Sequence, residues 1–239
     1  MFFKTLISIL CVCATAFPAA ASVVMQGNRV IYDASSSQKT VKFTNNDDFP
    51  YIVQVWASAS EDKQPVANEN IPFAVSPGIF KIQAKQDQNI SLLYTNANQK
   101  IDKEQVYYLH FTQVPSIIAG ERDKNKLVLI VNSVVKIFLR PTDLAISYDK
   151  MFDHIRYTMS PTTAGCDVII DNRSPYYLNS IQLTTKQNSM TNNTAMKMIA
   201  PLSTYTLHTT CNHSGAKPEF SINFINDYGV VQKQTLKEK

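Results

Sequence analysis

The sequence predicts an all-β protein built from two β-sandwich domains. Short runs rich in Val, Ile, Tyr and Phe recur along the chain, and Asn, Asp, Gly and Pro residues separate them. No long stretch holds the 3.6-residue period of an amphipathic helix. About six such runs before residue 140, at short spacing, favour a β-sandwich, and a second set of runs begins after that point.

The composition is that of a folded protein. Of 239 residues, 44% are hydrophobic and 18% are charged, which is too apolar for an intrinsically disordered chain. The formal net charge of +4 is not gathered into a cluster of Lys and Arg. A nucleic acid is therefore not expected as a partner.

Residues 1–21 have the layout of a cleavable signal peptide. Lys4 precedes an apolar run from Leu6 to Phe17, and Ala19 and Ala21 are the small residues expected before a cleavage site. The alternative is a membrane anchor, but the run of about 12 residues is short of the roughly 20 that span a bilayer. We therefore expect an exported protein without membrane insertion.

The strand-like runs divide at Arg140-Pro141, because proline donates no hydrogen bond to a strand ladder and restricts the residue before it. The predicted domains are 22–141 and 142–239. The runs of the first domain are 23–32, 39–44, 51–56, 89–95, 105–114 and 127–139. Those of the second are 167–170, 176–183, 204–209 and 220–225, with an exposed loop expected at 188–194.

The cysteines predict one disulfide. Two of the four lie in the leader, so Cys166 and Cys211 remain, 45 positions apart, in an exported chain. The alternative is a metal site, because His208 and His213 lie close to Cys211. That cluster lacks a second well-spaced ligand group, so no metal is expected.

The run 127–139 (LVLIVNSVVKIFL) is long for a strand, and both of its alternating faces are apolar at the start. Such a strand needs cover on both sides. It is either a central strand buried in its own domain or an edge that docks on a partner. The residues alone leave both readings open.

Several ordered blocks resemble one family along nearly the whole mature length. The blocks are GNRVIY at 27–32, TNN at 44–46, FPYIVQVW at 49–56, PFAVSP at 72–77, IFKI at 79–82, VKIFLRP at 135–141, NRSPYY at 172–177 and INDYG at 225–229. The sequence resembles the periplasmic chaperones of the chaperone–usher pathway, which assist the assembly of bacterial fimbriae. The short segment between Pro115 and Lys126 resembles their short-loop subclass.

The resemblance implies two immunoglobulin-like β-sandwich domains set at an angle, with a cleft between them. Arg29 and Lys136 would anchor the C-terminal carboxylate of a fimbrial subunit. Alternating side chains would fill a groove in the subunit's incomplete sandwich, and these are Leu127, Leu129 and Val131. Lys136 has the opposite parity to this set, so a bulge or the strand's exit into the cleft must reorient it.

The resemblance also implies an ionic cluster between the domains, formed by Glu104, Arg140 and Asp227. The expected partners are fimbrial subunits and an outer-membrane usher, and self-association of the free form is left open. The expected location is the periplasm, with no cofactor.

Two other functions compete with this interpretation. An enzyme is not expected, because no G-x-S-x-G, H-E-x-x-H or phosphate-loop motif is present. A fimbrial subunit or adhesin of the same pathway would show one incomplete sandwich and an N-terminal donor extension, whereas this sequence predicts two domains and begins its mature part with a strand.

Overall fold

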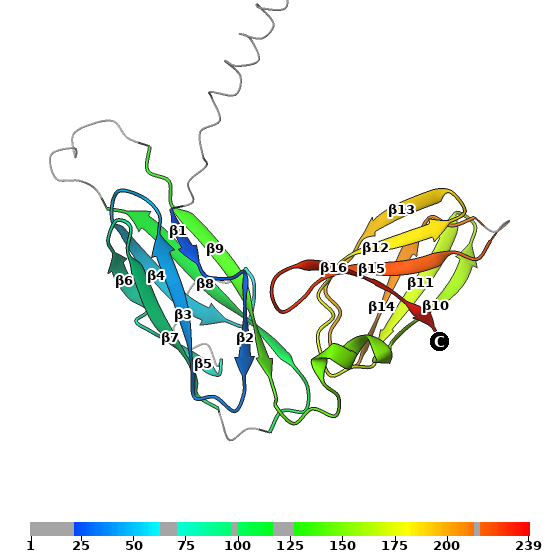
Figure 1. Ribbon diagram of the computed structural model, residues 1–239, viewed down its shortest axis with the longest axis horizontal. Coiled ribbons are helices and arrows are strands. Elements are labelled where there is room, and N and C mark those ends of the chain that lie inside the picture. Colours follow the sequence, from blue (N-terminus) through cyan, green and yellow to red (C-terminus); the bar gives the residue numbers. More distant parts are fainter. Residues whose placement is uncertain (1–21, 63–70, 97–99, 117–126, 213–215) are drawn as a thin grey trace, which may run out of the picture.

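The computed structural model describes residues 22–62, 71–96, 100–116, 127–212 and 216–239. The predicted signal peptide lies outside these residues, as do His213 and most of the segment between Pro115 and Lys126. The described chain forms two β-sandwiches, called here the first and second sandwich (Figure 1). No helix in these ranges is long and apolar enough to cross a bilayer.

The first sandwich packs a four-stranded sheet on a five-stranded sheet. The four-stranded sheet has the order β1 (Val23–Met25), β3 (Gln38–Asn45), β7 (Asp87–Tyr94) and β5 (Phe73–Ser76). The five-stranded sheet has the order β2 (Arg29–Asp33), β9 (Val131–Arg140), β8 (Gln105–Pro115), β4 (Tyr51–Ser58) and β6 (Ile79–Ile82). Alternate residues point inward, and Tyr32, Phe43 and Leu109 are fully buried between the sheets.

The second sandwich has two four-stranded sheets and a separate core. One sheet has the order β14 (Ser203–Thr209), β11 (Gly165–Asn172), β10 (Ile155–Thr162) and β17 (Lys237–Glu238). The other has the order β13 (Met190–Ala195), β12 (Ser180–Gln187), β15 (Glu219–Ile225) and β16 (Val231–Thr235). A 3₁₀ helix, Tyr148–His154, precedes this sandwich. The domain limits 22–141 and 142–239 stay predictions.

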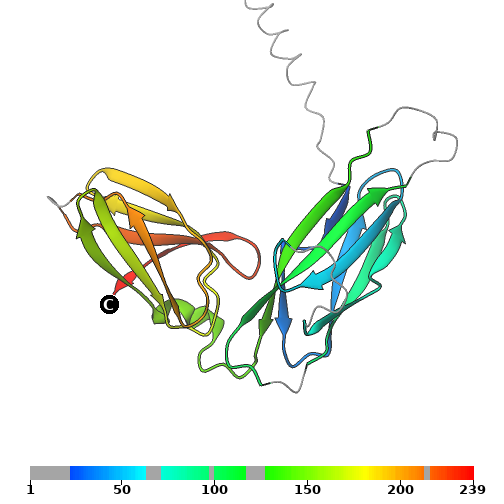
Figure 2. The ribbon, with the colours of Figure 1, turned by 180° about the vertical axis from the view of Figure 1, so that it is seen from behind.

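The two sandwiches lie side by side at an angle, and the β15–β16 hairpin reaches from the second toward the first (Figures 1 and 2). Small cavities between them are lined by residues of both. The predicted all-β class, the two sandwiches and the angle between them are therefore confirmed.

Several details of the predicted elements are wrong. The run 23–32 is two strands, because the chain turns at Gly27, whose φ is +85°, and moves from one sheet to the other between β1 and β2. The expected loop 188–194 is largely β13, a polar edge strand that pairs with β12. In the run 176–183 the strand begins only at Ser180.

Candidate functional site

A cavity of about 90 Å³ lies between the sandwiches and is lined by both predicted anchor cations. Arg29 begins β2 and Lys136 lies in β9, where the parallel ladder makes them direct Cα partners. Tyr108 on β8 flanks Lys136 on its other side. Asn179 and Ile225 line the cavity from the second sandwich. Two positive charges of the first sandwich thus face uncharged groups of the second.

The guanidinium of Arg29 is held by neutral acceptors. Its Nε donates to Oδ1 of Asn28 at 3.1 Å, and its Nη1 donates to the carbonyl oxygen of Ile225 at 3.3 Å. The hydrogen-bond pattern places the side-chain oxygen of Asn179 toward the guanidinium, where it accepts from Nη2 at 3.3 Å and also from Nη1. These contacts orient Arg29 across the boundary between the two sandwiches.

The guanidinium of Arg29 is half-buried and remains charged. Burial lowers the pKa of its guanidinium, and the negative charge of Asp227 acts in the opposite direction. The group stays protonated at neutral pH, because the ordinary pKa of arginine is above 12. The cavity therefore presents a permanent positive charge.

Lys136 is half-buried and, among the described residues, its side chain makes no hydrogen bond or ion pair. Its neighbours Val135 and Ile137 face the first core, so alternation turns Lys136 to the opposite face, toward the cavity. The β8–β9 ladder runs from Gln113↔Val131 to Gln105↔Leu139 without a register shift. The suggested bulge is therefore wrong, and ordinary strand alternation gives Lys136 its direction.

The apolar run ahead of Lys136 is exposed. The predicted strand 127–139 is four residues too long at its start, because β9 begins at Val131, where its pairing with β8 ends. Leu127 is 87% exposed, Leu129 is 68% exposed and Val131 is 43% exposed. Of the two readings that the sequence left open, a strand buried in its own domain is contradicted for this segment.

The beginning of β9 also has a free edge. On one side β8 pairs with β9 from Val131 onward, but on the other side β2 pairs only from Lys136 to Arg140. Along residues 131–135, no described strand pairs with β9 on that second side. Unpaired N–H and C=O groups at a strand edge are available to pair with another chain.

Glu104, Arg140 and Asp227 lie together at the boundary between the sandwiches. Arg140 contacts Glu104 Oε1 through Nε and Nη2, both at 2.8 Å. Its Nη1 and Nη2 donate to the two carboxylate oxygens of Asp227 at 2.6 and 2.9 Å. The second Glu104 oxygen accepts from the backbone N–H of Tyr177 at 2.9 Å. The cluster thus links Glu104 and Arg140 of the first sandwich to Asp227 and Tyr177 of the second.

Burial and ion pairing act in opposite directions on the pKa values of Glu104 and Arg140. Glu104 is 2% exposed, and burial raises the pKa of its carboxyl, while Arg140 counteracts that rise. For Arg140 itself, burial opposes the charge, but Asp227 and Glu104 outweigh it and raise the pKa. The guanidinium also lies over the Tyr148 ring, 4.4 Å from its centroid.

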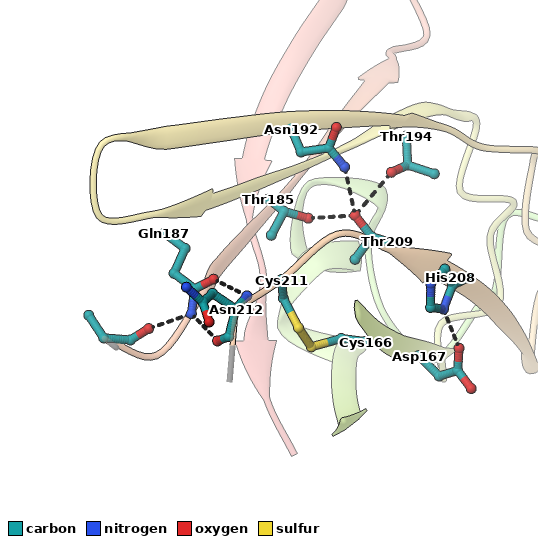
Figure 3. Close-up of a disulfide and its surroundings, with 11 residues drawn as sticks. Cys166, Asp167, Thr185, Gln187, Asn192, Thr194, His208, Thr209, Cys211 and Asn212 are labelled. Atoms are coloured by element: carbon teal, nitrogen blue, oxygen red, sulfur yellow. Dashed lines mark hydrogen bonds and ion pairs between the residues drawn. A yellow bond between two sulfur atoms is a disulfide. The ribbon is translucent and has the colours of Figure 1, made fainter. Parts of the chain in front are cut away.

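Cys166 and Cys211 form a disulfide with a Cα–Cα distance of 5.7 Å (Figure 3). It connects the start of β11 to the segment after β14, its neighbour in the same sheet. His208, offered as a metal ligand in the alternative reading, pairs with Asp167 at 3.0 Å. The described residues contain no cluster of three or more His, Cys, Asp or Glu that could hold a metal.

Sequence reasoning missed the residues that hold Arg29 and stack on Arg140. Asn28 lies inside the GNRVIY block and Asn179 lies two residues after the NRSPYY block, but the resemblance assigned no role to either amide. Tyr148 and Tyr176 lie against the Arg140 guanidinium, and the sequence assigned neither of them a role there. None of these contacts is visible until the two sandwiches are packed together.

Two family models match the chain and together span most of it. The pili and flagellar-assembly chaperone, PapD N-terminal domain, matches residues 22–145. The pili assembly chaperone PapD, C-terminal domain, matches residues 152–236.

Named relatives match over similar lengths. Chaperone protein HifB of Haemophilus influenzae is 30% identical over 91% of this chain and 88% of its own length. Chaperone protein FimC of Escherichia coli strain K12 is 27% identical over 89% of this chain and 83% of its own length.

Solved structures share the fold. The crystal structure of the YadV chaperone gives a TM-score of 0.72 at 24% identity, covering 90% of this chain and all (100%) of that one. The Pseudomonas aeruginosa CupB2 chaperone gives 0.73 at 21% identity, with the same coverage. At these identities the likeness establishes the two-sandwich fold.

Proposed function

The chain belongs to the pili assembly chaperone family, and from that premise we propose that it is a periplasmic chaperone that binds fimbrial subunits by donating a β-strand. It captures a subunit, completes the subunit's unfinished sandwich, prevents premature polymerisation and delivers the subunit to an outer-membrane usher. The observation that carries this proposal is the exposed apolar segment 127–131, which continues into the free edge of β9 beside two cations.

The apolar segment has the chemistry of a donated strand. Leu127, Leu129 and Val131 alternate, so in an extended conformation their side chains point to one side. Burying each of them in a subunit groove contributes about 1.5–3 kcal/mol before ordering costs. Main-chain hydrogen bonds along the edge add affinity with little dependence on the subunit's sequence.

The cavity with Arg29 and Lys136 supplies an anchor for a terminal carboxylate. A carboxylate taken out of water needs charged donors. Lys136 has no other partner among the described residues, and the acceptors around Arg29 are uncharged. The anchor sets the register, and the alternating side chains then enter the groove.

The remaining parts of the proposal concern the surroundings of this site. The cluster of Glu104, Arg140 and Asp227 sets the angle between the sandwiches rather than binding the subunit. The signal peptide 1–21 directs export, and release proceeds by exchange for a better-fitting strand of the next subunit, without a nucleotide. The family is a chaperone family, and we expect no catalytic activity.

Co-purification from the periplasm tests the proposal. A tagged chaperone expressed with its fimbrial operon is expected to bring down a small β-rich subunit. Leu129→Glu places a charge in the groove, and Lys136→Ala removes half of the anchor, so each should reduce recovered subunit by about tenfold or more.

Two matched controls separate these effects from general damage. Leu202→Glu changes an exposed leucine of the second sandwich, which is 59% exposed. Lys39→Ala removes an exposed cation from β3, in the other sheet of the first sandwich. Both should recover the subunit as wild type does. Normal recovery with Leu129→Glu and Lys136→Ala would contradict strand donation at this site.

A further inference from the structure

The contacts of Arg29 indicate that the second sandwich takes part in the anchor. We propose that Asn179 is a positioning residue, which holds the Arg29 guanidinium toward the cavity shared with Lys136 without neutralising its charge. This inference rests on the proposed function and deepens it, because it assigns to the second sandwich a share in recognising the subunit's terminal carboxylate.

Asn179 is itself well fixed in the second sandwich. The preceding residue, Leu178, is fully buried and forms a reciprocal backbone pair with Ile199, with both N–H···O distances at 2.9 Å. The carbonyl oxygen of Asn179 accepts from the N–H of Ile225 at 3.0 Å. The Asn179 amide and the Ile225 carbonyl that contact Arg29 are therefore held by the same backbone hydrogen bonds of the second sandwich.

The donors of Arg29 can be counted. A guanidinium has five N–H groups. Nε donates to Asn28, and Nη1 donates to Ile225 and Asn179. Nη2 gives one N–H to Asn179, which leaves one Nη2 N–H for a ligand. An incoming carboxylate thus meets that N–H and the ammonium of Lys136, with the guanidinium already in position.

The neutrality of these acceptors is the informative feature. Arg140, a short distance along β9, is bound by the carboxylates of Glu104 and Asp227, so its charge is compensated within the protein. Arg29 is bound only by two amides and a carbonyl, so its charge stays available. The exposed Glu61 also lines the cavity, but it forms no ion pair with either cation among the described residues.

The decisive variant is Asn179→Asp, which keeps the shape and the acceptor and adds a negative charge. Asp at this position would still hold Arg29, but it would neutralise the charge that the subunit's carboxylate needs. Asn179→Ala removes the acceptor and lets the guanidinium move, so that ordering it again costs affinity.

The probes are two synthetic peptides of the C-terminal strand of the subunit identified by co-purification. One ends in a free carboxylate and the other in a carboxamide. Titration calorimetry with the full-length mature chaperone gives the ratio of their affinities. We expect wild type to favour the free acid, Asn179→Asp to lower the acid affinity by about tenfold or more, and Asn179→Ala to lower it several-fold. The amide affinity should change little in either variant.

Asn193→Asp is the matched control, because it adds the same charge on exposed β13, which lies away from the cavity. It should keep the wild-type ratio. If wild type fails to distinguish acid from amide, both the anchor and this inference are wrong. If wild type distinguishes them and the Asn179 variants do so equally well, this inference alone is wrong. Equal weakening of both peptides by Asn179→Asp would also overturn it, since Asn179 would then act on the fold or the groove.

Discussion

At the scale of single residues, two buried asparagine side chains stabilise turns at the ends of strands. Asn45 is fully buried and donates to the carbonyl of Phe49 while accepting from the N–H of Asp47. Asn172, at the corresponding end of β11, is also fully buried and donates to the carbonyl of Tyr176. Each side chain replaces backbone partners that a turn cannot supply.

Tyr51 lies beside the first of these turns and makes the fold sensitive to alkaline pH. Its hydroxyl donates to Oδ2 of Asp47 at 2.6 Å, and burial together with Asp47 raises its pKa to about 12. In the unfolded chain the pKa is about 10. The folded protein therefore retains this proton where the unfolded chain loses it. The stabilisation is complete below about pH 10 and is lost as the pH rises toward 12.

Tyr51→Phe should remove this dependence. Urea unfolding at about pH 9, 10 and 11 should show wild type losing stability faster than the variant, because the variant has no proton to lose at this position. Tyrosinate absorbance should show one late titration step fewer in Tyr51→Phe. Identical slopes of stability against pH in the two proteins would contradict the assignment.

At the scale of elements, side-chain patterns predicted the buried strands well and the polar strands poorly. The runs 51–56 and 105–114 became β4 and β8, because their inward residues alternate with outward ones in the core of the first sandwich. The polar run 188–194 predicted a loop, yet most of it is β13, which is held by backbone pairing with β12 and buries little. Backbone hydrogen bonds between strands do not depend on side-chain hydrophobicity, so a hydrophobic pattern does not predict such a strand.

The ends of elements were predicted poorly for the same reason. Residues 127–130 have the composition of a strand, but the pairing with β8 ends at Val131, opposite Gln113. The run 23–32 was predicted as one strand, but its polar middle contains Gly27, where the chain turns and changes sheets. The site residues were predicted to the same extent. Arg29 and Lys136 were identified by motif resemblance, whereas the role of Asn179 depends on the packing of two segments that are distant in the sequence.

The disulfide acts on one element pair, β11 and β14, and its effect should be confined to the second sandwich. Its ends are 45 residues apart, and closing a loop of that length stabilises a fold by about 4 kcal/mol before strain. We expect the double variant Cys166→Ser/Cys211→Ser to lower the free energy of unfolding of the second sandwich by about 2–4 kcal/mol.

The single tryptophan allows the two sandwiches to be followed separately. Trp56 lies on β4, so its fluorescence reports the first sandwich. In urea, the fluorescence midpoint of the double variant should match wild type, while circular dichroism should show an earlier phase. A common shift of both signals would mean that the sandwiches unfold as one unit.

At the scale of the whole molecule, a few polar contacts decide how the two sandwiches are placed. Asp227 extends from the β15–β16 hairpin to Arg140, and Glu104 accepts from Tyr177 of the second sandwich. Asn28 donates to the carbonyl of Gly229 at 3.3 Å on the same hairpin. Asn28 therefore contributes both to the contacts that hold Arg29 and to those that place the hairpin.

The two ends of the ionic cluster should fail in different ways. The side chain of Asp227 is 24% exposed, and that of Glu104 is 1% exposed. In Asp227→Ala the hairpin loses its bidentate link, but Arg140 keeps Glu104, so the angle should loosen while each sandwich stays folded. In Arg140→Ala the buried Glu104 loses its counter-ion, which should cost about 3–5 kcal/mol of stability.

Small-angle scattering should show a wider distance distribution for Asp227→Ala, with an unchanged Trp56 unfolding midpoint, whereas Arg140→Ala should shift that midpoint. A scattering profile of Asp227→Ala that matches wild type would mean that the hydrogen bonds of Glu104 and Asn28 set the angle without Asp227.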